Sequence, residues 1–119
     1  MGIILLVDDD FDIVTLNKKY LASKGHHIFT ADCGELAMQA LDGDVFDCIV
    51  LDVLLPDVLG FDLCRKIREI SSTPIIFLNC NDQDDAKTKG LLSGGNDYMT
   101  KPFSMRELES RIRDQIRRL

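Results

Sequence analysis

The sequence lacks the long apolar run that a membrane helix needs. No stretch approaches the roughly 20 consecutive apolar residues required to span a bilayer, and the N-terminus lacks the basic start and apolar core of a signal peptide. Repeats, low-complexity segments and linkers are also missing. These absences predict one soluble, cytoplasmic domain over residues 1–119, with no membrane partner.

Closely spaced cysteines are also missing. The four cysteines are far apart, without the paired spacing of a zinc site. Hydrophobic residues make up 45% of the chain, enough to fold without disulfides. We therefore expect Cys33, Cys48, Cys64 and Cys80 to be buried free thiols in a reduced compartment.

Positive charge is scarce outside the end of the chain. Residues 1–100 carry 17 acidic and 8 basic side chains, a balance of −9, whereas residues 101–119 carry 3 acidic and 6 basic ones, a balance of +3. An acidic body repels nucleic acid, so we expect no direct nucleic acid binding by this domain. The basic end would complement a helix C-terminus or the acidic face of a partner.

Short apolar runs alternate along the chain with amphipathic stretches. The runs, which we expect to form strands, span residues 3–7, 27–31, 48–51, 75–78 and 97–100. The first, third and fourth are continuously apolar, as in parallel strands covered on both faces. The alternation predicts an α/β fold of the (βα)5 type, a parallel sheet with helices on both faces.

The stretches between these runs have apolar residues at helical spacing. We expect one helix to begin at an Asp10 or Asp12 cap and the last at Ser104, which would form a capping box with Glu107. The residues expected to face the core are Val14, Leu16, Tyr20 and Leu21, then Ala37, Met38, Ala40 and Leu41, then Phe61, Leu63, Cys64, Ile67 and Ile70, and finally Met105, Leu108, Ile112 and Ile116.

Residues 82–93 give the weakest helical pattern. Only Ala86, Leu91 and Leu92 are available for burial, and Gly90 inside the helix costs roughly 1 kcal/mol relative to alanine. We expect a marginal, mobile helix there.

Unusual polar residues follow the expected strands. They are Asp8, Asp9, Asp10, Asp52, Asn79, Cys80 and Lys101. Because ligands bind beyond the C-terminal ends of the strands in such sheets, we expect these residues to form one rim. Carboxylates this close repel one another and lose hydration, and Mg²⁺ prefers hard oxygen ligands. A cation site is therefore expected, with Asp10 acting only as a helix cap.

Four motifs at this rim match a known family. LLVDDD, LDVLLPDVLG, PIIFLNCND and NDYMTKPFS, in this order and spacing, resemble the receiver domain of two-component response regulators. The chain is most similar to receivers that precede a winged-helix DNA-binding domain, since KPFSMREL before a basic helix is typical there. The resemblance implies a flavodoxin-like fold with strand order 2-1-3-4-5. It also implies a switch that catalyses only its own phosphorylation and dephosphorylation.

The resemblance implies specific site residues. A histidine kinase would donate a phosphoryl group to Asp52, the phosphoacceptor. The implied Mg²⁺ ligands are Asp8, Asp9, Asp52 and the backbone carbonyl of Leu54. Lys101 would contact the phosphoryl group, and Tyr98 would be the aromatic residue that swings inward on activation.

Asn79 departs from the pattern of the family. Receivers nearly always have Ser or Thr at this position, whose hydroxyl hydrogen-bonds the phosphoryl oxygen and couples it to the aromatic switch. The Asn79 amide can donate a hydrogen bond to the phosphoryl group, but it is longer and adds a carbonyl. We expect phosphorylation of Asp52 with weakened or altered switching.

Several alternatives stay open at this point. A receiver fold used as a phosphorylation-independent interaction module is the main rival, supported by Asn79. The output surface implied by the family is strand five with the last two helices, where Asp97 and Arg111 would form a homodimer pair. The chain is either complete or cut from a regulator with a C-terminal DNA-binding domain. Asp57 is expected to be a turn residue, and His26 and His27 to have no metal role.

Overall fold

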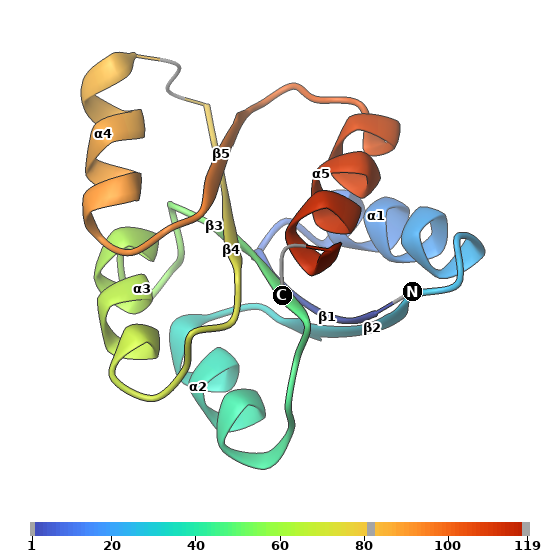
Figure 1. Ribbon diagram of the computed structural model, residues 1–119, viewed down its shortest axis with the longest axis horizontal. Helices are drawn as coiled ribbons and strands as arrows, with labels where there is room; N and C mark the ends of the chain where they lie inside the picture. The colour runs from blue at the N-terminus through green and yellow to red at the C-terminus, as the bar shows by residue number, and fades with distance from the viewer. Residues whose placement is uncertain (1, 81–82, 118–119) are drawn as a thin grey trace.

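The computed structural model describes residues 2–80 and 83–117. Its strands form one parallel sheet in the order β2-β1-β3-β4-β5 (Figure 1). They are β1 (Ile3–Val7), β2 (His27–Ala31), β3 (Cys48–Asp52), β4 (Ile75–Asn79) and β5 (Asp97–Thr100). The predicted fold class and strand order are confirmed. Two strands run one residue further than predicted, so Asp52 and Asn79 end β3 and β4 rather than follow them.

The helices are α1 (Phe11–Ser23), α2 (Gly34–Gly43), α3 (Gly60–Arg68), α4 (Asp84–Leu92) and α5 (Met105–Arg117). Helices α1 and α5 lie on one face of the sheet, and α2, α3 and α4 lie on the other (Figure 1). The predicted start of the fourth helix at Asp82 lies outside the described residues. In the described part of the chain, no helix combines the length and apolar character that crossing a membrane requires.

Alternating side chains of the strands build a core on each face of the sheet. Leu5 and Val7 of β1 point to the core under α2 and α3, whereas Ile4 and Leu6 point to the core under α1 and α5. β3 and β4 are buried along their whole length, which agrees with their continuously apolar sequences. Asp52 and Asn79, the last residues of these strands, are thereby anchored in the fully buried centre of the sheet.

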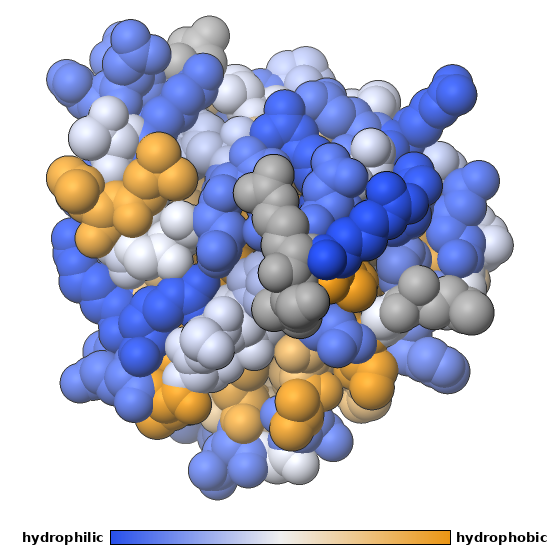
Figure 2. Space-filling view, in the orientation of Figure 1, coloured by the Kyte–Doolittle hydropathy of each residue, from blue (hydrophilic) through white to orange (hydrophobic). Residues whose placement is uncertain are grey.

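Four apolar residues predicted to face the core are exposed. Leu16 is 58% exposed, because its neighbour Asn17 occupies the buried side of α1. Ile70 lies beyond the end of α3 and is 59% exposed. Leu91 and Leu92 are 57% and 80% exposed. Figure 2 shows apolar side chains gathered on the surface over the region of α4.

Gly90, predicted to weaken its helix, is the residue of α4 that is buried. A Cβ atom at this position would lie 3.1 Å from the Phe77 ring and 3.3 Å from the Tyr98 ring. A Cβ atom at Gly95, just after α4, would overlap the Phe77 ring. The two glycines let the backbone approach this ring, which explains how α4 packs without burying a large side chain.

The predicted helix caps are largely confirmed. Asp10 accepts hydrogen bonds from the N–H groups of Asp12 and Ile13 at 3.1 and 3.2 Å. Ser104 accepts one from the N–H of Glu107 at 3.0 Å, while the Glu107 carboxylate pairs with Arg111 at 2.9 Å. Only the Ser104 half of the expected capping box is therefore present among the described hydrogen bonds.

All four cysteines are free, as predicted, but not all are buried. Cys48 and Cys64 are buried, and burial raises the pKa of the Cys48 thiol to about 12. Cys33 is only partly buried and Cys80 is exposed, which corrects the expectation for both. Cys80 lies just past the end of β4, where the chain leaves the sheet.

Candidate functional site

Three carboxylates meet at the C-terminal edge of the sheet. Asp8 and Asp9 follow β1, and Asp52 ends β3, which pairs with β1. Carboxylate oxygens of the three residues all lie within 4.8 Å of one another. Asp8 and Asp52 are buried, with 5% and 6% exposure, whereas Asp9 is exposed. The predicted acidic rim is thus a compact cluster.

Lys101 is the cation that faces this cluster. Its Nζ lies 3.1 Å from Asp52 Oδ2 and 3.5 Å from Asp8 Oδ2. The residue follows β5 directly, and its backbone N–H donates to the Asn79 carbonyl at 2.8 Å, which fixes where the side chain begins. A cis peptide bond joins Lys101 to Pro102.

Ionisation of Asp52 is less favourable in the folded protein than in water. Burial, followed by the charge of Asp8, raises the Asp52 pKa from 3.8 to about 6, although the Lys101 ammonium works in the opposite direction. One oxygen of the carboxylate contacts Lys101 and the other accepts a hydrogen bond from the Leu54 N–H at 3.3 Å. One lysine therefore leaves the acid cluster incompletely neutralised.

One buried oxygen of Asp8 has no hydrogen bond among the described residues and only the Lys101 ammonium, at 3.5 Å, beside it. Asp8 Oδ1 accepts a hydrogen bond from the Asp10 N–H at 3.0 Å, but buried Asp8 Oδ2 has no hydrogen-bond partner among the described residues. Buried polar atoms are normally satisfied. Three carboxylates with one unsatisfied oxygen fit a small divalent ion that prefers oxygen ligands. The cluster can therefore hold a metal.

The other predicted site residues lie around this cluster. Leu54 is 61% exposed and lies in the loop between β3 and α3, where it forms an isolated β-bridge with Leu59. The Asn79 Oδ1 accepts a hydrogen bond from the N–H of Cys80 at 2.9 Å. Tyr98 is half-buried, with its ring centroid 6.5 Å from that of Phe77. Leu54 and Asn79 thus flank the acids, while Tyr98 packs one strand further out.

The two residues predicted for a dimer face pair within one chain. Arg111 Nη1 lies 2.8 Å from Asp97 Oδ1, and Nη2 of the same guanidinium contacts Glu107. Both acids hold the pKa of Arg111 above its usual value against the opposing effect of burial. These contacts fix α5 against β5 in the single chain.

Sequence reasoning missed two polar residues with defined contacts. Asp57, expected to be a simple turn residue, accepts hydrogen bonds from the N–H groups of Gly34 and Glu35. His26 is buried; its Nδ1 accepts from the N–H of Gly2 at 3.0 Å, and its Nε2 lies 2.9 Å from Glu109 Oε2. These partners are 22 to 83 residues away in the sequence, so no local motif could reveal them.

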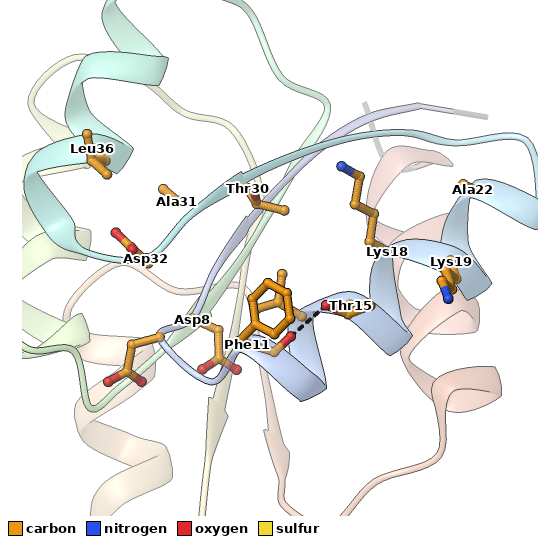
Figure 3. A pocket seen from close by; sticks show the side chains of 12 residues that line it. Asp8, Phe11, Thr15, Lys18, Lys19, Ala22, Thr30, Ala31, Asp32 and Leu36 are labelled. Atoms are coloured by element: carbon orange, nitrogen blue, oxygen red, sulfur yellow. Dashed lines mark hydrogen bonds between the residues drawn. The ribbon is translucent and has the colours of Figure 1, made fainter.

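Two cavities lie beside α1, one lined by Asp8 and Asp9 and the other by Lys101. One, of about 690 Å³, lies between α1 and the end of β2, with Asp8 toward one end and the amines of Lys18 and Lys19 toward the other (Figure 3). The second, of about 480 Å³, is lined by Cys80, Lys101 and apolar residues of α1 and the β5–α5 loop. The first cavity therefore opens on two acids of the cluster, and the second on Lys101.

Comparison with known proteins agrees with this geometry. Residues 4–113 match the family described as response regulator receiver domain. The transcriptional regulatory protein SpaR of Bacillus subtilis is 41% identical over 99% of this chain and 53% of its own length. The alkaline phosphatase synthesis regulator PhoP of the same species is 41% identical over 97% of this chain and 48% of its own.

The fold is likewise that of solved response regulators. A two-component response regulator from Clostridium difficile superposes with a TM-score of 0.95 at 32% identity, covering 99% of this chain and 98% of the other. The receiver domain of the Francisella response regulator 1452 gives the same TM-score at 33% identity, with the same coverage. The chain spans about half the length of the curated relatives it matches.

Proposed function

The chain belongs to the response regulator receiver domain family, and on this premise we propose that Asp52 is the residue that accepts the phosphoryl group. Receiver domains act in two-component signal transduction, partnered with histidine kinases, and are generally not enzymes with separate substrates. The observation that carries the proposal is the ammonium of Lys101, which contacts both Asp52 and Asp8 within a cluster of three carboxylates. No other acid at the end of a strand has this arrangement among the described residues.

In the proposed reaction, a carboxylate oxygen of Asp52 attacks the phosphorus of a phosphohistidine on the kinase. An O–P bond forms as the N–P bond breaks, and the leaving imidazole nitrogen takes up a proton. The transferred group carries negative charge on three oxygens, so charge neutralisation and positioning dominate the catalysis. Lys101, already 3.1 Å from Asp52, is placed to exchange part of that contact for a phosphoryl oxygen.

The fit of the acid cluster to a divalent ion supports Mg²⁺ as the cofactor. Asp8, Asp9, Asp52 and the Leu54 carbonyl would hold it. When bound, the ion supplies the positive charge that allows an anionic donor to approach a carboxylate. Asp8 Oδ2 is buried, lacks a hydrogen bond among the described residues and lies 3.5 Å from Lys101, and it would gain a ligand contact.

Asn79 would alter the coupling between the phosphoryl group and the output surface. In its present orientation the side-chain oxygen is held by the N–H of Cys80. To donate from its amide nitrogen to a phosphoryl oxygen, Asn79 needs to present that nitrogen to the phosphoryl group on Asp52. A hydroxyl could instead rotate freely to donate. Switching of Tyr98 would therefore be weaker than with Ser or Thr at this position.

The wider role of the chain follows from its relatives. Those we compared are transcriptional regulatory proteins about twice as long. We propose that residues 1–119 form the receiver of such a regulator, working in the cytoplasm with a C-terminal DNA-binding domain. Homodimerisation through α4, β5 and α5 would require Asp97 and Arg111 to exchange part of their internal pair across the interface.

Mass spectrometry after incubation with acetyl phosphate tests the proposal. The wild type with Mg²⁺ should gain one phosphoryl group, and the adduct should disappear without Mg²⁺ or in Asp52→Asn. As a matched control, Asp62→Asn removes an exposed carboxylate that pairs with Arg65 on the surface and should leave the adduct unchanged. Persistence of the adduct in Asp52→Asn would refute the assignment. No adduct together with no Mg²⁺ binding would favour a phosphorylation-independent module.

A further inference from the structure

Asp57 caps a helix that has no cap of its own. Cys33, at the N-cap position of α2, makes no side-chain capping hydrogen bond. Instead, Asp57 Oδ1 accepts from the N–H of Gly34 at 2.8 Å and Asp57 Oδ2 accepts from the N–H of Glu35 at 3.0 Å. These backbone hydrogen bonds hold the Asp57 pKa below its usual value, so the carboxylate is ionised at neutral pH. The cap comes from the loop between β3 and α3.

That loop begins at the proposed acceptor. Asp52 ends β3, Leu54 lies two residues on, and Asp57 lies three residues further. Leu54 forms a bridge with Leu59, and the N–H of Gly60 donates to the carbonyl of Val53 at 2.6 Å, so the loop closes on itself. Asp57 connects this closed loop to α2 through its hydrogen bonds with the N–H groups of Gly34 and Glu35.

The hydrogen bonds of Asp57 to α2 complete a ring of contacts around the acid cluster. On the other side, the N–H of Asp8 donates to the carbonyl of Ala31 at 3.1 Å, at the end of β2. The chain continues from Ala31 through two residues to Gly34, where the Asp57 carboxylate joins it to the β3–α3 loop. The ring therefore connects the segment that carries Asp8 to the segment that carries Asp52 and Leu54.

From this geometry we infer that Asp57 is a positioning residue for the cation site. It holds the β3–α3 loop against the N-terminus of α2, and thereby sets the position of Leu54 relative to the carboxylates of Asp8 and Asp52. It does not contact the cation itself. The inference rests on the proposed function, because it assumes that these residues bind Mg²⁺.

Packing at Gly34 of α2 also shows that this helix and the β3–α3 loop lie in close contact. A Cβ atom at Gly34 would lie 2.5 Å from Val58 Cγ1 and 3.4 Å from Asp57 Oδ1. The loop lies so close to the helix that only glycine fits without displacing Val58. Gly34→Ala should therefore push the loop away while every carboxylate of the protein is kept. By contrast, a Cβ atom at Gly43, at the other end of α2, meets nothing within 4 Å.

Titration of the ¹⁵N-labelled chain with MgCl₂, followed by amide chemical shifts, tests the inference. Second-shell partners of metal ligands typically change affinity by about 10–100-fold when mutated. Because Asp57 acts one step further away, through a loop, we expect a Mg²⁺ dissociation constant about 3- to 10-fold higher in Asp57→Ala. Gly34→Ala should raise it similarly, and Asp57→Asn, which keeps one acceptor oxygen, should fall between Asp57→Ala and wild type.

The controls separate loop position from charge and from stability. Asp32→Asn removes an exposed acid from the wall of the cavity beside Asp8 without touching the Asp57 hydrogen bonds, and Gly43→Ala adds a methyl group to the same helix. Both should bind Mg²⁺ within about twofold of wild type, as expected for surface changes. In the wild type, Mg²⁺ should also shift the amide signals of Gly34 and Glu35, and this response should disappear in Asp57→Ala.

The outcomes distinguish this inference from the proposed function. If the wild type binds Mg²⁺ but Asp57→Ala and Gly34→Ala, with native spectra, bind it within twofold of wild type, the positioning role is refuted while the proposed function stands. If the wild type binds no Mg²⁺, the proposed function fails and the positioning role fails with it. A loss in Asp57→Ala matched by an equal loss in Asp32→Asn would mean that charge alone matters, which also overturns the inference.

Discussion

Removing the charge of Asp52 should stabilise the metal-free protein. The carboxylate is buried beside Asp8, and in the part of the chain that the structure describes Lys101 alone forms ion pairs with the two acids. Asp52→Asn keeps the shape of the side chain and removes its charge. Asp52→Asn should therefore abolish the proposed function but raise the free energy of unfolding. This is expected where a functional site holds charges that repel one another.

The magnitude follows from the pKa of Asp52. Its rise from 3.8 to about 6 corresponds to about 3 kcal/mol, because each tenfold change in an acid dissociation constant is worth about 1.4 kcal/mol. This shift already includes the favourable contact with Lys101. Because solvent screens part of the interaction, we expect a gain of about 1–3 kcal/mol at neutral pH. For a domain of this size that gain raises the melting temperature by about 3–10 °C.

The sign of the pH dependence is fixed by the direction of the pKa change. Well below its ordinary pKa of 3.8 the acid is protonated in both the folded and the unfolded protein and costs nothing. As the pH rises toward the folded pKa of about 6, the unfolded chain ionises first and the wild type loses stability. The advantage of Asp52→Asn should therefore be full at pH 7.5 and shrink as the pH is lowered toward 5.

Urea unfolding followed by circular dichroism, in EDTA and then in MgCl₂, provides the assay. Mg²⁺ should stabilise the wild type by an amount that grows with its concentration, and should stabilise Asp52→Asn less. Asp62→Asn, on the surface, should stay within about 0.5 kcal/mol of wild type in both solutions. If Asp52→Asn is no more stable than the wild type in EDTA, the acid cluster is not strained and the reasoning is refuted.

Three further substitutions test other parts of the structure. His26→Ala removes a hydrogen-bond donor from a buried carboxylate and should cost about 2–3 kcal/mol in urea unfolding, whereas His27→Ala, at the exposed neighbour, should stay within about 0.5 kcal/mol. Asn79→Thr should increase the population of the active conformation after phosphorylation, seen in amide spectra; an unchanged population would contradict the proposed effect of the longer amide. Gly95→Ala should destabilise by about 1–3 kcal/mol, because the added methyl group overlaps the Phe77 ring, and an unchanged midpoint would show that the ring can move aside.

The parallel sheet and its acidic edge could be predicted because both depend on local sequence. The continuously apolar runs identified the buried strands, and residues that follow parallel strands necessarily meet at one edge. The positions of Asp8, Asp52 and Lys101 in the site therefore follow from their order alone. The order of residues could not predict how far the acids are neutralised. That depends on the side-chain conformation by which Lys101 contacts both Asp8 and Asp52.

Periodicity failed where it could not distinguish a buried from an exposed apolar residue. Leu16 and Leu91 have helical spacing, yet the buried positions beside them belong to Asn17 and Gly90. Helix propensity treats Gly90 only as a cost, whereas the ring of Phe77, in a different element, makes glycine the residue that fits. Tertiary contacts of this kind override local preferences and leave no trace in the spacing.

α4 buries little of its surface, and it packs against Tyr98, the residue proposed as the switch. α3 buries five residues and α5 buries four, whereas in α4 only Gly90 is buried. Hydrophobic burial provides most of the free energy that holds a surface helix, so α4 is the helix that costs least to displace. At Gly90, α4 packs against the rings of Phe77 and Tyr98. Tyr98 lies on β5, three residues before Lys101. A rearrangement that follows phosphorylation of Asp52 and withdraws Tyr98 from this contact would therefore move α4 before it moved any better-packed helix.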